Sequence, residues 1–273
     1  MKCIDFDRHF AEYTARWVNE NAGKYSNEDE MERQFIDVYR QWLRTPADWL
    51  GKTAPEDYFA KHSDAKLLVQ WMRDYFSQGV AVPDLLLERI AELDDAPVEL
   101  MALLSKPTRD EDEAKLCAIG LMAEMDSSEA FDLYIGWIAR GDKSDDLAER
   151  AADAMMQGAA PFRDKLLSAY DGATKAGKLR LLDILAYIND DDRIFSLFLK
   201  HFNEGENRAL FASYLQKYGD DRALPDLKAA LMDPKTGYLD YIEIKNVIEF
   251  FGETIDIERD FSGDSDYEAL KNI

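Results

Sequence analysis

Apolar and polar residues follow the spacing of amphipathic helices along most of this chain. In the C-terminal two-thirds, polar turns recur, and the first apolar residues after them are separated by 32, 32, 32 and 29 positions: Val98, Ala130, Phe162, Ile194 and Ala223. Similar units of about 30 residues, with helical spacing inside each unit, are typical of stacked helix pairs. The pattern therefore predicts an all-α fold built from repeats.

The repeats are predicted as five helix pairs and one final helix. The pairs cover 84–93 with 97–104, 110–125 with 128–139, 144–157 with 161–170, 175–188 with 192–202, and 205–218 with 222–232, and the final helix covers 238–251. In the second helices, an apolar stripe lies four and eight residues after the aligned position. We expect these residues to be buried: Ala102, Tyr134, Leu166, Phe198 and Leu227, then Ile138, Tyr170, Phe202 and Leu231.

Residues 1–80 do not share this period. Four aromatic residues recur at helical steps in a helix predicted over 5–21: Phe6, Phe10, Tyr13 and Trp17. Further helices are expected over 28–44, capped by Asn27, and over 63–77, with short helical turns at 45–51 and 54–59. We interpret residues 1–80 as an irregular, aromatic-rich helical subdomain that caps the repeats of residues 81–252. Gly252 is expected to end the final helix, and the acidic segment 253–273 to be loosely ordered at its end.

The junctions Ile184–Arg193 and Tyr214–Pro225 resemble those of short bacterial HEAT-like repeats, which belong to the armadillo superfamily. The resemblance covers roughly residues 82–252. It implies a right-handed α-α superhelix, a solenoid whose second helices line a concave surface that mostly binds other macromolecules. Because such a motif specifies packing and turns, it does not identify a partner.

The charge is strongly negative and unevenly distributed. The net charge is −22, and residues 1–80 carry 11 Lys and Arg against 14 Asp and Glu, which leaves −19 for the remaining residues. Such a field repels nucleic-acid phosphates and anionic lipids, because binding either requires cationic side chains. It attracts basic proteins, and it also keeps a protein soluble without any binding role. We therefore expect neither a nucleic-acid nor a membrane partner.

The cysteines and the apolar segments indicate the cellular compartment in which the protein is expected. Cys3 and Cys117 are far apart and have no spacing typical of a disulfide framework or a zinc site. The N-terminus has no apolar signal segment, and no stretch approaches the length that spans a bilayer. These features predict a soluble, cytoplasmic protein.

A search for catalytic chemistry finds no motif. The three histidines, His9, His62 and His201, lack the spacing of metal ligands, and the stretch Gly172–Gly177 is a turn without the spacing of a phosphate-binding loop. A calcium loop centred on Gly263 fails because Ala269 stands where a bidentate Glu is required. We expect no catalytic residue, no metal and no cofactor.

The candidate binding residues lie on the second helices. Asp132 and Asp164 stand two positions after the aligned residue, and Trp137 and His201 stand seven positions after it. On a concave face, such an acidic strip with a tryptophan could hold a cationic peptide. The alternatives are that Trp137 is a core residue, that His201 is structural, and that acids at helix starts, such as 110–113 and 145–146, only cap those helices.

The sequence favours a non-enzymatic scaffold that binds a basic protein through its acidic repeats. One specific version is an immunity-like or antitoxin-like protein that masks a basic toxin. An alternative is an enzyme similar to the helical-repeat DNA glycosylases, but such an enzyme needs Lys and Arg along its groove, where this chain carries acids. A further alternative is a regulatory domain that binds a small cationic ligand in a deep acidic pocket.

Overall fold

The chain folds as an all-helical protein. The computed structural model describes residues 2–25, 27–256 and 259–271, and these ranges contain no β-strand. The chain divides into two compact units, Met1–Ala130 and Phe131–Ile273. The division falls inside the repeats, whereas the sequence pattern placed a boundary near residue 80.

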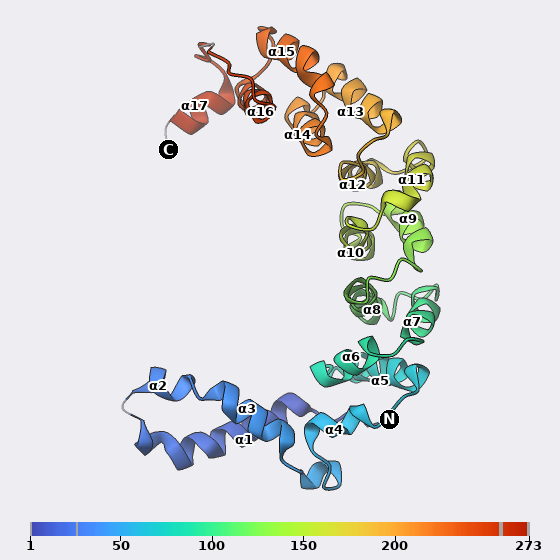
Figure 1. Cartoon of the computed structure of the whole chain (residues 1–273), viewed down its shortest axis with the longest axis vertical. Helices are drawn as coiled ribbons and strands as arrows, with labels where there is room; N and C mark the ends of the chain where they lie inside the picture. Colours follow the sequence, from blue (N-terminus) through green and yellow to red (C-terminus); the bar gives the residue numbers. More distant parts are fainter. Residues whose placement is uncertain (1, 26, 257–258, 272–273) are drawn as a thin grey trace. The chain divides into compact units, whose positions relative to one another are not determined.

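The N-terminal unit contains the aromatic block and the first helices of the repeats (Figure 1). Its elements are α1 (Phe6–Asn21), η1 (Ala22–Lys24), α2 (Glu28–Glu32), α3 (Phe35–Arg44), η2 (Asp48–Leu50), α4 (Pro55–Ala60), α5 (Ala65–Gln78), α6 (Asp84–Ala91), α7 (Ala96–Leu104) and α8 (Asp112–Glu124). Helix α1 packs against α3, and α4 packs against both α3 and α6. The aromatic block, the first predicted pair and the first helix of the second pair therefore share one compact unit.

The predicted helix over 28–44 is broken in the structure. Helix α2 ends at Glu32, and α3 starts at Phe35. Four of the five residues of α2 are acidic, so this segment has no apolar face to bury. The predicted N-cap is confirmed, because the Asn27 side chain accepts a hydrogen bond from the Glu30 backbone N–H at 2.8 Å.

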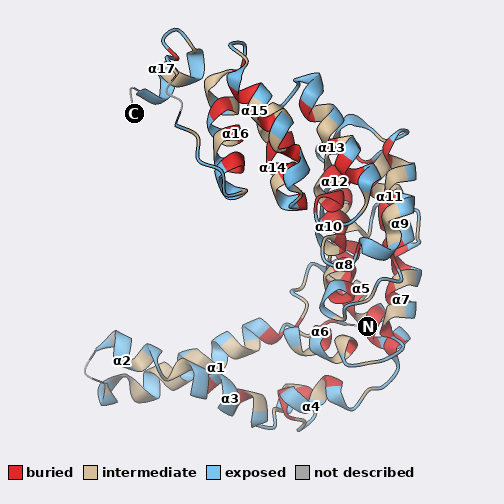
Figure 2. Cartoon of the chain, turned by 45° about the horizontal axis from the view of Figure 1, so that its top comes forward, coloured by how far each residue is buried: buried red, intermediate tan, exposed pale blue. Residues whose placement is uncertain are grey.

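The C-terminal unit contains the remaining helix pairs. Its elements are α9 (Phe131–Arg140), α10 (Asp146–Met155), η3 (Ala160–Phe162), α11 (Arg163–Tyr170), α12 (Lys175–Leu185), α13 (Asp192–Glu204), α14 (Arg208–Tyr218), η4 (Asp221–Ala223), α15 (Leu224–Met232), α16 (Tyr238–Phe250) and α17 (Ser265–Lys271). Helices 10, 12, 14 and 16 form one layer and helices 9, 11, 13 and 15 the other, with buried residues between them (Figure 2).

The layer of second helices lies on the outer side of the bend in this unit. Figures 1 and 2 place α10, α12, α14 and α16 on the inner side. The expectation that the second helices line a concave surface is therefore wrong for this unit. Side-chain size favours this direction in the first part of the unit, where α9 buries the rings of Phe131 and Tyr134, while α10 buries three alanines and α12 buries Gly177. Smaller side chains allow helices to approach more closely. The difference does not extend to α14, which also buries aromatic rings.

The predicted apolar stripe is confirmed in the C-terminal unit. The residues four and eight positions after the aligned residue are all buried there: Tyr134, Leu166, Phe198, Leu227, Ile138, Tyr170, Phe202 and Leu231. The expectation fails in α7, where Ala102 is exposed and Leu100, Leu103 and Leu104 are buried instead. Val98, the aligned residue of that pair, is also exposed, so this first pair presents a different face to its neighbours.

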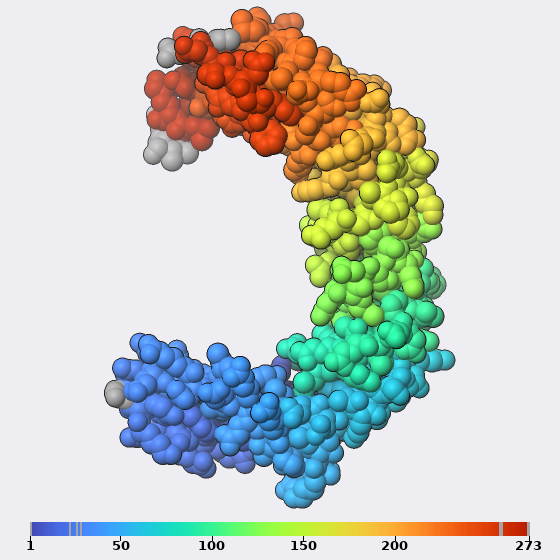
Figure 3. All heavy atoms as spheres, in the orientation of Figure 1, coloured from blue at the N-terminus to red at the C-terminus, as the bar shows by residue number. Residues whose placement is uncertain are grey.

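The acidic C-terminal segment contains a helix that the sequence pattern did not predict. Gly252 ends α16 with a φ of 84°, as expected. Beyond it, the buried ring of Phe261 packs edge-on against Tyr238 and Tyr241, and α17 follows. The segment (red) lies against the preceding helices in Figure 3. Residues 257–258 and 272–273 lie outside the described residues.

Helix α12 begins against the end of α9 with almost no space between the backbones. The Thr174 hydroxyl donates a hydrogen bond to the Gly141 carbonyl at 2.6 Å and accepts one from the Gly177 N–H. A Cβ atom built on Gly177 would lie 2.5 Å from the Ile138 carbonyl oxygen. The stretch Gly172–Gly177, which the sequence suggested was only a turn, thus contains a cap and a close approach.

We expect Gly177→Ala to destabilise the C-terminal unit. The added methyl group would overlap backbone atoms that cannot rotate away, and overpacking of this kind costs about 1–3 kcal/mol. Gly172→Ala is the matched control, because nothing lies within 4 Å of a Cβ atom at that position. Urea unfolding followed by circular dichroism measures both variants. Equal stability of Gly177→Ala and the unchanged protein would contradict the predicted overlap.

Candidate functional site

Three ion pairs join successive helices of the outer layer in the C-terminal unit. In each pair a cation near the start of one helix reaches an acid near the start of the preceding one, with 2.7 Å between nitrogen and oxygen: Lys165 to Asp132, Arg193 to Asp164, and Arg222 to Asp192. All six side chains are more than half exposed. Exposed pairs contribute about 0.2–1 kcal/mol each, so their main effect is to fix orientation.

Two of these cations also bind an acid within their own turn. The Asp191 carboxylate accepts hydrogen bonds from the Arg193 backbone N–H at 3.0 Å and from its guanidinium at 2.6 and 2.9 Å. Asp220 accepts the same set of bonds from Arg222. We call this Asp-x-Arg arrangement the turn clasp. It caps the next helical segment, and it orients the arginine toward the neighbouring helix.

The clasp changes the titration of its acids. Hydrogen bonds from the Arg193 side chain lower the pKa of Asp191 to about 2. The equivalent bonds from Arg222 lower the pKa of Asp220. Since the Asp191 side chain is only 8% exposed, this carboxylate is held inside the turn and is not available to a partner.

Tyr218 connects the two turns. Its hydroxyl donates a hydrogen bond to the Asp191 carbonyl at 3.0 Å and accepts one from the Asp191 N–H at 2.8 Å. Burial raises the pKa of Tyr218, so the hydroxyl stays protonated and can make both bonds. The turn at 189–192 is thereby fixed to the end of α14.

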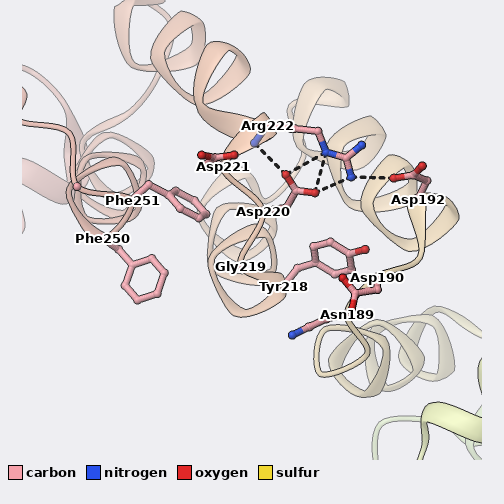
Figure 4. A pocket seen from close by; sticks show the side chains of 11 residues that line it. Asn189, Asp190, Asp192, Tyr218, Gly219, Asp220, Asp221, Arg222, Phe250 and Phe251 are labelled. Atoms are coloured by element: carbon pink, nitrogen blue, oxygen red, sulfur yellow. Dashed lines mark hydrogen bonds and ion pairs between the residues drawn. The ribbon is translucent and has the colours of Figure 1, made fainter.

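These turns border a hollow of about 960 Å³. Figure 4 shows Arg222 between Asp220 and Asp192 on one side, and the rings of Phe250 and Phe251, from the end of α16, on the other. Asp190 and Asp221 also line the hollow. We call the hollow and its lining the acidic turn edge.

Two acids of the acidic turn edge are not used by the fold. Asp190 and Asp221 are exposed, and neither has an ion-pair or hydrogen-bond partner for its side chain among the described residues. Asp190 adopts a left-handed backbone conformation with a φ of 65°, which aspartate tolerates better than most residues. Beside them, Phe250 is 60% exposed. The edge therefore presents two carboxylates and an apolar ring to solvent.

The structure does not bring the residues singled out in the sequence into one site. Asp132 and Asp164 belong to the ion pairs of the outer layer, with Lys165 and Arg193. Trp137 is half-buried, with its ring centroid 5.8 Å from that of Tyr134. None of the three lines the acidic turn edge.

His201 lies in a separate cavity of about 420 Å³ in the same unit. Its Nε2 atom is 2.7 Å from the Tyr170 hydroxyl, and its Nδ1 atom is 2.8 Å from Glu204. The imidazole also stacks on Phe211 at 5.0 Å. Burial raises the pKa of Tyr170, with Glu204 adding to the rise, so this tyrosine stays protonated and is not an activated nucleophile.

The sequence pattern did not identify the residues of the acidic turn edge, because their roles depend on which acids bind an arginine in the folded chain. The repeated Asp-x-Arg motif at 191–193 and 220–222 was the available signal. It distinguishes acids bound within their turn, such as Asp191, from neighbours such as Asp190. Without that distinction, all the turn acids resemble helix caps.

Neither metal chemistry nor similarity to other proteins identifies the site. The part of the chain that the structure describes contains no group of three or more His, Cys, Asp or Glu side chains that could hold a metal ion. None of its helices is long and apolar enough to cross a bilayer. No protein-family model, curated protein or solved structure matches the chain. The resemblance to HEAT-like repeats stays a prediction.

We expect Asp191→Asn to lower the free energy of unfolding at pH 7 by about 1 kcal/mol, because asparagine can still cap the helix but cannot bind Arg193 as a charge. The folded pKa of Asp191 is depressed to about 2, below the ordinary value of about 3.9. The clasp therefore contributes fully above about pH 4, and its contribution is lost as the pH falls toward 2.

Urea unfolding of both proteins at pH 7 and at several values down to pH 2.5 tests this expectation. The difference between them should shrink as the pH falls. Asp190→Asn is the control, since this neighbouring exposed acid has no ion-pair partner among the described residues and should change stability little. A difference that stays constant with pH would show that the carboxylate charge of Asp191 does not stabilise the turn.

Proposed function

We propose that this protein is a non-enzymatic scaffold of HEAT-like helical repeats that binds a basic protein through the acidic turn edge. In this proposal the helix pairs continue as a right-handed solenoid. The observation that carries the proposal is the pair of exposed, unpaired acids, Asp190 and Asp221, beside the exposed ring of Phe250.

Some of the turn acids are bonded to arginines and others are not, and this difference supports a binding role in addition to capping. Asp191, Asp192 and Asp220 are bonded to arginines, so the fold accounts for them. Capping does not account for Asp190 and Asp221 in this way, because their side chains accept no hydrogen bond among the described residues. Two like charges on one hollow repel each other, and a cationic partner would relieve that repulsion.

The aromatic residues favour arginine or lysine side chains as the groups recognised. A cation over an aromatic face is attracted by about 0.5–1 kcal/mol at exposed sites. The unit already contains such contacts: Lys217 Nζ lies 5.4 Å from the Tyr187 ring centroid, and the Arg222 guanidinium carbon lies 4.6 Å from that of Phe195. Phe250 could receive a partner's cation in the same way.

The charge of the chain argues against nucleic acid as the partner. At a net charge of −22, the protein repels phosphates at long range and attracts basic surfaces. We also propose a cytoplasmic location, which is supported by the low number of cysteines and by their spacing, since Cys3 and Cys117 do not follow the pattern of a disulfide framework.

Binding of arginine-rich and lysine-rich peptides, measured by fluorescence anisotropy, tests the proposal. We expect binding that weakens steeply as salt is raised, and Asp190→Asn/Asp221→Asn to weaken it about tenfold, as expected for the loss of two exposed charge contacts. Asparagine tolerates the left-handed backbone at position 190, so the turn should keep its shape.

The matched control is Asp146→Asn/Glu149→Gln, which removes the same charge from exposed positions on α10. It should bind as the unchanged protein does. Equal losses in both double variants would mean that only the overall charge attracts the peptides. Binding that is insensitive to salt, or tight binding of duplex DNA at moderate salt, would contradict the proposal.

A further inference from the structure

The N-terminal unit contains a groove of about 1,010 Å³ between α1 and the segment 41–52. It belongs to the aromatic block and is separate from the acidic turn edge. Tyr13 and Trp17, one helical turn apart on α1, line one wall, and Trp42 and Trp49 line the other. Four aromatic side chains thus border a single hollow.

The segment that carries Trp49 is held in a fixed conformation. The Ala47 N–H donates to the Thr53 carbonyl at 3.0 Å, and the Lys52 N–H donates to the Ala47 carbonyl at 2.9 Å. Gly51 closes the turn with a φ of 63°. The His9 imidazole stacks on the Trp49 ring at 3.9 Å between centroids, which fixes the ring as well. The wall is therefore formed before any ligand binds.

Several hydrogen-bond donors line the groove without a partner among the described residues. Trp42 is only 5% exposed, and its indole N–H donates no hydrogen bond among the described residues. The same holds for the indoles of Trp17 and Trp49 and for the side chains of Arg16 and Gln41. None of these nitrogens is among the fully buried polar atoms that lack a partner in the described part of the chain, so water reaches them, and a ligand with free acceptors would replace that water.

The charges around the groove nearly cancel. Asp48 is paired with Lys52, and Glu12 is paired with Arg8. Arg16 and Glu20 then balance each other. The groove is thus suited to a ligand that binds by ring packing and hydrogen bonding, unlike the basic partner proposed for the acidic turn edge.

We propose that this groove binds a proline-rich segment in the polyproline II conformation. Such a segment has no internal hydrogen bonds, so its carbonyl groups are free acceptors for the unpaired indole, guanidinium and amide donors. Its proline rings pack between aromatic side chains, and its preformed conformation loses little entropy on binding. A rigid, near-neutral, donor-rich groove lined by aromatic residues matches each of these properties.

Titration with a synthetic oligoproline peptide of about ten residues tests the proposal. Isotope-labelled indole N–H signals in NMR spectra are the readout, and tryptophan fluorescence supplies the affinity. We expect the signals of Trp17, Trp42 and Trp49 to shift, while those of Trp71 and Trp137, which do not line the groove, stay in place. A Gly-Ser peptide of equal length should shift none of them.

Arg16→Ala/Gln41→Ala removes two exposed donors without touching the rings and should weaken binding roughly tenfold. Arg33→Ala/Gln34→Ala, which changes the same residue types outside the groove, should bind normally. Groove signals that do not respond to oligoproline would overturn the proposal. So would equal binding of the Gly-Ser peptide, or unchanged affinity in the groove variant.

Discussion

Hydrogen bonding between arginines and turn carboxylates connects the helix pairs of the C-terminal unit. Each turn clasp satisfies a helix start, holds an arginine in one orientation and directs it to the preceding helix of the outer layer. The stripe of buried rings supplies most of the burial, while the bidentate bond of each arginine to the acid of its own turn fixes the direction in which the guanidinium points. At two of the junctions, the register between neighbouring outer helices is thus also marked by a directional bond at one edge.

The same interaction decides which surfaces remain for partners. In a chain with an excess of acids, a carboxylate enclosed by an arginine, such as Asp191, is less available to a partner than an exposed neighbour such as Asp190, which has no such bond among the described residues. The groove of the aromatic block differs, because indole, guanidinium and amide N–H donors line it. The binding chemistries that we propose for the two units differ accordingly.

Helical periodicity predicted most elements and the buried stripe, because a pattern such as Tyr134 and Ile138 depends only on spacing within one helix. It could not predict which layer lies on the outer side of the bend, since that depends on how side chains of different helices, such as Phe131 and Gly177, pack together. The site was harder to predict. Asp190 and Asp191 are identical neighbours in sequence, yet a positive φ at Asp190 leaves one exposed while Tyr218 and Arg193 hold the other.

Phe261 packs against the last long helix of the C-terminal unit. In a series of helix pairs, each pair contacts only its neighbours. The last helix of the series therefore has a side that no later pair covers. Here the ring of Phe261 packs on Tyr238 and Tyr241 of α16, and the Arg259 guanidinium donates to the Asp233 carbonyl. The ring of Phe261 therefore does for α16 what a following helix does for an earlier one, because it keeps apolar ring surface away from water.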